Sequence, residues 1–76
     1  MRKERNEALK RFGRAVRTLR KERGLSQEGL ALEADINRTY MGGLERGEEN
    51  VSLLTILKLC AVLKVDASKI LLEASL

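Results

Sequence analysis

Residues 26–47, SQEGLALEADINRTYMGGLERG, decide the fold of this chain. The stretch opens with Ser26, a residue type that caps helix N-termini, and continues with apolar residues at helical spacing. These are Leu30, Ala31 and Ala34. Asp35 then tolerates the left-handed conformation that often ends a helix, and Asn37 is a strong N-cap for the next one. The pattern predicts two short helices joined by a tight corner.

The second helix of this pair is expected over residues 38–45, with two unlike faces. Met41 and Leu44 are three residues apart and are expected to point inward, whereas Arg38, Thr39 and Gly42 are expected to face outward. A short helix, a turn of three or four residues and a second helix with an exposed polar start form a helix-turn-helix, here at about residues 26–46. In that motif the second helix lies in the major groove of DNA and its first residues meet base edges.

The same stretch, with residues on both sides of it, resembles the Cro/C1-type (XRE) helix-turn-helix family over residues 12–65. The matching pieces are Arg17 and Arg20, GLSQE at 24–28, LA at 30–31, LERG at 44–47, SL at 52–53, Leu63 and Val65. The run DINRTY at 35–40 is similar to the restriction–modification controller proteins, which are small dimeric regulators of that family. The resemblance implies an all-α, five-helix, lambda-repressor-like domain that binds double-stranded DNA.

Two residues at the start of the second helix are the candidates for reading bases. Arg38 can present two parallel N–H donors to O6 and N7 of guanine, and Thr39 can contact a thymine methyl group or a base acceptor. Gly42 and Gly43 have no side chain to read bases with, and they can let the helix approach DNA closely. Readout is therefore expected from Arg38 and Thr39, with DNA shape contributing the rest.

A second set of residues is expected to bind phosphate, partly because the family places such contacts there and partly because helix N-termini favour anions. The set is Gln27, Tyr40, Arg46, Arg20 and Asn37. For Gln27 the alternative is a plain exposed helix former, and for Tyr40 it is partial burial with the hydroxyl at the rim. Glu48 and Glu49 stand where relatives often carry a basic residue, which favours fewer phosphate contacts in that loop or acids turned away from DNA.

The resemblance also implies an ion pair between Arg20 and Glu45. This pair would tie the first helix of the chain to the end of the reading helix, and the alternative is an exposed arginine at a helix end. Removing one partner of a buried pair leaves an unmatched charge and is costly.

Composition and charge fit one small helical domain over residues 1–76. Helix formers dominate, the chain has no proline, and its net charge is +4. The charge is uneven. Residues 1–23 hold ten Lys or Arg and three Glu, whereas residues 24–76 hold five Lys or Arg and eight Asp or Glu. A basic end suits phosphate, although a solvated helix face is the commoner outcome of such a run.

Several classes of function find no support in the residues. There is no histidine and one cysteine, Cys60, so metal binding and nucleophilic catalysis have little to build on. No apolar run approaches the roughly 20 residues of a membrane span, and the charged first residues are unlike a signal peptide. We expect no enzymatic activity, no cofactor or metal, no small-molecule substrate, no membrane, and a reducing cytoplasm.

Three further helices are expected outside the motif. Residues 1–5 are expected to be frayed, and the first helix should run over 6–23 with Asn6 as its N-cap. Its buried stripe would be Leu9, Phe12, Val16 and Leu19. Ser52 would cap a helix ending at Leu63, and Asp66 would cap a helix over 67–74.

The last two helices carry more apolar surface than a small core can cover. The expected stripe of the fourth is Leu53, Ile56, Leu57, Cys60 and Leu63, with Leu54, Leu59 and Val62 outside it. We therefore predict a dimerisation region at about residues 52–76, in which like patches meet about a two-fold axis. The predicted interface residues are Leu59, Ile70, Leu71 and Leu72. The alternative is that the last helix covers its own core.

Together these features predict a homodimeric transcriptional regulator that binds an inverted-repeat operator. The two reading helices would lie about 34 Å apart, one turn of DNA. If the controller resemblance holds, the protein regulates its own gene and a restriction endonuclease gene, as activator and then repressor. The alternatives are a phage-type or general XRE repressor and an antitoxin-like protein-interaction module.

Overall fold

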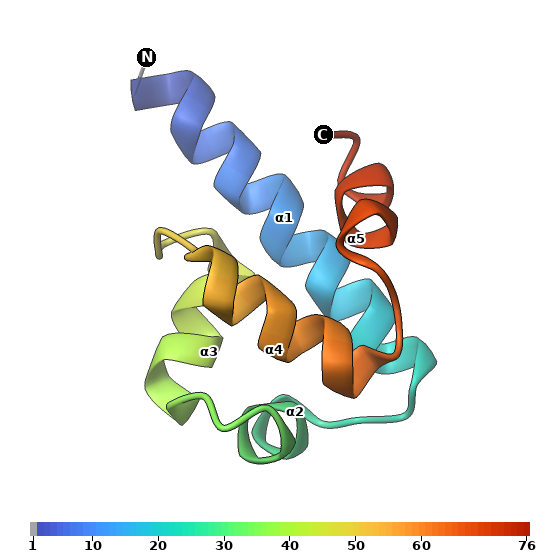
Figure 1. Cartoon of the computed structure of the whole chain (residues 1–76). Helices are drawn as coiled ribbons and strands as arrows, with labels where there is room; N and C mark the ends of the chain where they lie inside the picture. Colours follow the sequence, from blue (N-terminus) through green and yellow to red (C-terminus); the bar gives the residue numbers. More distant parts are fainter. Residues whose placement is uncertain (1) are drawn as a thin grey trace.

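The computed structural model describes the backbone of residues 2–76 and the side chains from residue 6 onward. The helices are α1 (Arg2–Glu22), α2 (Gln27–Glu33), α3 (Arg38–Arg46), α4 (Leu53–Leu63) and α5 (Ala67–Glu73) (Figure 1). Residues 2–76 contain no strand. The predicted all-α fold with five helices is confirmed.

The first helix begins earlier than expected. It starts at Arg2, so Asn6 lies exposed within the helix and is not its N-cap, and the backbone of residues 2–5 is helical. The expectation of a frayed start is wrong for these four residues, while Met1 lies outside the described residues. Arginine, lysine and glutamate are all good helix formers, so nothing in residues 2–5 opposes extension of the helix.

The corner between α2 and α3 is built as predicted. Ser26 Oγ accepts a hydrogen bond from the Gly29 N–H (2.9 Å), and Asn37 Oδ1 accepts one from the Tyr40 N–H (3.1 Å). Asp35 takes a left-handed conformation with φ of 56°. These local contacts fix where each helix begins and so set the angle at which α3 leaves the corner.

The hydrophobic core is formed by side chains from all five helices. Its members are Phe12, Ala15, Val16, Leu19, Leu30, Ala31, Ala34, Met41, Leu44, Leu59, Leu63, Ile70 and Ala74. In Figure 1, the long α1 runs diagonally through the molecule, with α5 beside it and α2 and α3 below it. The end of α3 packs against the middle of α1 at Gly13. The expected inward positions Met41 and Leu44 are both fully buried. No helix within residues 2–76 is long and apolar enough to cross a membrane.

Two glycines allow α1 to lie directly on the backbone of α3. A Cβ atom on Gly13 would lie 2.5 Å from the carbonyl oxygens of Leu44 and Glu45. Just beyond α3, Gly47 has φ of 79°, and a Cβ atom there would lie 2.7 Å from Lys10 Cα. A side chain at either position would push the two helices apart, so the glycines hold α3 in place against α1.

The rotation of α4 differs from the predicted stripe. Leu59 is fully buried, whereas Leu53 and Leu57, which were expected to face inward, are exposed. Ile56 and Cys60 are partly buried against the core. A helix that is apolar on most sides carries no clear periodic signal, so its sequence does not fix which side packs inward. Leu59 and Leu63, four residues apart, are both buried in the core.

Two of the four predicted interface residues are thereby corrected. Leu59 and Ile70 both have 0% of their surface exposed within the protomer, so neither offers surface to a partner chain. Leu71 and Leu72 remain exposed on α5. Cys60 packs as a small apolar side chain, as expected. Burial and the nearby Asp66 carboxylate raise the pKa of its thiol, which favours the uncharged form.

Candidate nucleic-acid interface

The outward side of α3 carries two rows of residues, which we call the reading face. One row is Arg38, Gly42 and Arg46, spaced four residues apart, and the other is Thr39 and Gly43. Arg38, Thr39 and Arg46 are exposed. Residues four apart lie above one another on a helix, so each row forms one strip of surface. The two predicted base readers therefore lie side by side at the start of the helix.

A buried ion pair fixes the other end of α3, as the family resemblance implied. Arg20 Nε donates to Glu45 Oε2 at 2.7 Å, and Arg20 Nη2 donates to Glu45 Oε1 at 3.1 Å. Arg20 Nη1 also donates to the carbonyl oxygen of Leu25 at 2.9 Å. This bidentate geometry ties α1, α3 and the turn before α2 together. Because Arg20 is only 8% exposed, we assign it this positioning role in place of the expected phosphate contact.

Gln27 connects the buried pair to the reading face. Its Nε2 donates to Glu45 Oε1 at 3.0 Å, and its Oε1 accepts from Arg38 Nη1 at 2.6 Å. Gln27 is thus more than the plain exposed helix former that was its alternative. A continuous hydrogen-bonded chain runs from Arg20 in the interior to Arg38 at the surface. It orients the Arg38 guanidinium while leaving other donors of that group without a partner among residues 6–76.

Gly42 lies on the outward side of α3, as expected, but it is buried there because polar side chains cover it. A Cβ atom there would lie 3.1 Å from Arg46 Nη1, 3.4 Å from Gln27 Oε1 and 3.6 Å from Arg38 Nη1. The glycine leaves room for three polar side chains to converge over one bare turn of α3. At this position, the surface of the reading face therefore consists of guanidinium and amide groups.

Tyr40 is placed as in the alternative to phosphate binding, with its ring partly buried and its hydroxyl at the rim of the core. It is half-buried, and its hydroxyl donates to the carbonyl oxygen of Asn50 at 2.8 Å. A phenol has a single O–H donor, so this bond must open before Tyr40 can donate to a phosphate. Asn37 is better placed, because its Oδ1 caps α3 while its exposed amide N–H groups stay available.

The loop after α3 places its two acids differently. Glu48 Oε1 lies 3.1 Å from Arg46 Nε in an exposed ion pair. Glu49 is partly buried and lies on Gly43, where an added Cβ atom would be 2.9 Å from Glu49 Oε2. Sequence reasoning missed this contact and the Gln27 bond to Glu45. Gly42 and Gly43 could have indicated such contacts, since a helix face without side chains leaves room for a side chain from another segment.

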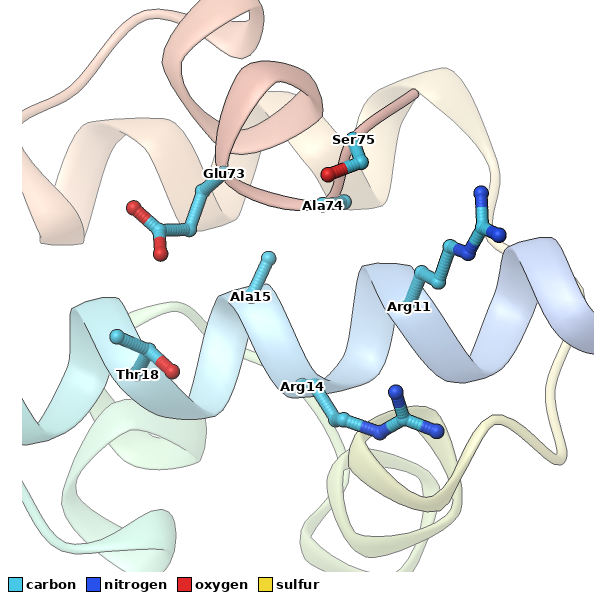
Figure 2. A pocket seen from close by; sticks show the side chains of 7 residues that line it. All are labelled: Arg11, Arg14, Ala15, Thr18, Glu73, Ala74 and Ser75. Atoms are coloured by element: carbon cyan, nitrogen blue, oxygen red, sulfur yellow. The ribbon is translucent and has the colours of Figure 1, made fainter.

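A shallow polar hollow lies between α1 and α5 (Figure 2). Arg11 and Glu73 stand at opposite ends of it, and Ala15 and Ala74 form part of its floor. No buried polar group points into it, so we assign it no ligand. Among the described residues, no three His, Cys, Asp or Glu side chains are grouped to hold a metal ion.

Comparison with known proteins finds helix-turn-helix proteins by both sequence and structure. A helix-turn-helix family model, HTH_3, matches residues 16–70. The chain is 41% identical over 66 residues to control protein C.MunI of Mycoplasma sp, covering 86% of this chain and 89% of that protein.

Two solved structures extend the comparison. The crystal structure of the restriction-modification controller protein C.AhdI from Aeromonas hydrophila shares 47% identity with a TM-score of 0.79. The match covers 82% of this chain and 94% of that chain. SinR, a master regulator for biofilm formation crystallised in complex with DNA, shares 33% identity with a TM-score of 0.76. This match covers 79% of this chain and 97% of that chain.

Proposed function

The chain belongs to the HTH_3 helix-turn-helix family of DNA-binding transcriptional regulators, and from this premise we propose that it is the controller protein of a restriction–modification system. The observation that carries the narrower assignment is the 47% identity with C.AhdI over 94% of that chain. In this role the protein regulates its own gene and an endonuclease gene. Two dimers at adjacent sites turn activation into repression as the protein accumulates.

The reading face supports a division of labour between base and phosphate contacts. Arg38 reads a guanine and Thr39 reads its neighbour, since both are exposed at the start of α3. Gln27, Asn37, Arg46 and Tyr40 contact phosphates around them. Phosphate contacts carry register and much of the affinity, whereas base contacts carry sequence choice.

A homodimer supplies the second reading helix. Exposed leucines gather on the last two helices: Leu53, Leu54 and Leu57 on α4, and Leu71, Leu72 and Leu76 at α5. Leu71, Leu72 and Leu76 line one shallow hollow, so a partner that covers it removes three leucines from water together. We assign dimerisation to residues 52–76 and the helix-turn-helix to residues 26–46 of a single domain.

A selection of bound duplexes from random DNA tests this function. The expected product is an inverted repeat with a guanine at equivalent positions in each half, about one helical turn apart. Recovery of no enriched sequence at low ionic strength would overturn the proposal. A complex with a protein partner that is insensitive to salt would instead support the antitoxin-like alternative.

A further inference from the structure

The Glu49 side chain packs against Gly43 on the reading face, in space that a side chain at position 43 would otherwise fill. A Cβ atom on Gly43 would lie 2.9 Å from Glu49 Oε2, 3.0 Å from its Cγ and 3.4 Å from its Cδ. These separations are tighter than ordinary contacts of a Cβ atom, so the carboxylate end of Glu49 rests directly on the helix. Any larger residue at position 43 would displace it.

The contact between Glu49 and Gly43 lies next to Thr39, a predicted base reader. Gly43 follows Thr39 by four residues on α3, so the two share one strip of the helix surface. Thr39 is exposed and lies in the first turn of α3, where base contacts are expected. The Glu49 carboxylate is thus delivered from the following loop to a position one turn further along the same strip.

The charge of Glu49 is not neutralised by a near partner. Among residues 6–76 its carboxylate makes no hydrogen bond or ion pair, and the neighbouring Arg46 is paired with Glu48. An unpaired carboxylate beside DNA is repelled by phosphates and weakens binding to every sequence alike. Such a group is compatible with tight binding where it meets a hydrogen-bond donor on a base.

The chemistry of base edges selects that donor. In the major groove, cytosine presents its N4 amino group as a donor. Adenine also presents an amino group, but the N7 acceptor beside it faces the second carboxylate oxygen unfavourably. We propose that Glu49 is a specificity residue that accepts a hydrogen bond from a cytosine amino group. The proposal rests on the DNA-reading role of α3 given above.

The decisive experiment compares base preferences of Glu49→Gln and the wild-type chain across a panel of single-base variants of the selected operator. The wild type prefers cytosine at one position of each half-site. Glu49→Gln loses roughly five- to a hundred-fold of that preference and shifts toward adenine, because glutamine can bond both N6 and N7 of adenine. Glu48→Gln is the matched control, since it removes the same charge from the same loop and leaves the base profile unchanged.

Gly43→Ala separates the position of the carboxylate from its charge. The added methyl group displaces Glu49 without altering net charge, and alanine is a better helix former than glycine, so the helix is retained. We expect the cytosine preference to fall as in Glu49→Gln, with the unfolding temperature of both variants measured alongside.

Two results would overturn this assignment. One is a Glu49→Gln variant that binds all duplexes more tightly with an unchanged base profile. This would show that the carboxylate only repels phosphate, whatever the sequence. The other is an unchanged profile in Gly43→Ala. Failure of the wild type to select any sequence would instead refute the proposed function itself, so the two failures are distinguishable.

Discussion

Arg38 is oriented before any duplex arrives. Its guanidinium is held by Gln27, which is itself anchored on the buried Glu45 carboxylate. A side chain fixed in this way loses less conformational entropy on binding than a free arginine does. At the residue scale, the affinity of Arg38 for its proposed guanine is therefore expected to depend on interior contacts as well as on the arginine.

Replacing Arg38 tests base reading directly. Arg38→Ala is expected to cost about 1–3 kcal/mol on the cognate site and to flatten the preference at one position, because a bidentate guanine contact is lost. Titration of cognate and single-base variant duplexes measures both effects. An equal loss on every duplex would show that Arg38 contacts phosphate alone.

Arg46 gives the contrasting case at the same scale. Its exposed pairing with Glu48 is weak, so the guanidinium is free to turn toward a phosphate. Arg46→Ala should lower affinity across all sequences and reduce the salt slope of binding by about one. Binding isotherms over a salt series provide the slope, and a slope equal to that of the wild type would remove Arg46 from the phosphate set.

At the scale of the elements, the placement of α3 depends on its close approach to α1. Gly13 lies against two carbonyl oxygens of α3, which cannot move without moving the helix. Helix propensity alone predicts that Gly13→Ala stabilises α1, whereas the steric conflict predicts the reverse.

Gly13→Ala is accordingly expected to destabilise the fold by roughly 3 kcal/mol or more, at the upper end of overpacking effects. Gly24→Ala is the control, because Gly24 has φ of 72° and open space around it, so only backbone strain of about 1–2 kcal/mol applies. Urea denaturation followed by circular dichroism measures both. A Gly13→Ala protein as stable as the wild type would contradict the close packing of α1 on α3.

The limits of prediction from sequence also appear at this scale. The caps Ser26 and Asn37 and the left-handed Asp35 were predictable because their causes lie within a few residues of each. The start of α1 was missed because Asn6 is a residue type that caps helices, whereas here it lies within the helix.

Contacts between distant residues were harder to predict. The pair of Arg20 with Glu45 spans 25 residues and came from the family resemblance alone. The seating of Glu49 on Gly43 was not foreseen, because it depends on the path of a loop. The face of α4 that carries Leu59 was misjudged, since apolar residues surround that helix.

At the scale of the whole molecule, the exposed leucines bear on the proposed homodimer. A chain of 76 residues has a small core, and the leucines left outside it favour association. The shallow hollow lined by Ser68, Leu71, Leu72, Ser75 and Leu76 gives α5 a surface that a second copy can fill.

Leu71→Glu tests this arrangement. Burying a carboxylate between two copies is costly, so the variant should shift from dimer to monomer at concentrations where the wild type is paired. Sedimentation equilibrium gives the mass of each. Leu32→Glu is a suitable control, because Leu32 is exposed on α2, outside the predicted dimerisation region of residues 52–76. A Leu71→Glu mass equal to that of the wild type would exclude α5 from the interface.

The position of Tyr40 has a practical consequence. The chain contains one tyrosine and no tryptophan, and the phenol hydroxyl donates to the Asn50 carbonyl beside the reading face. Tyrosine fluorescence of the protein therefore arises from a single ring located where a duplex would dock. Any ligand that opens that bond or stacks near the ring alters the emission, so association can be followed optically without attaching a dye.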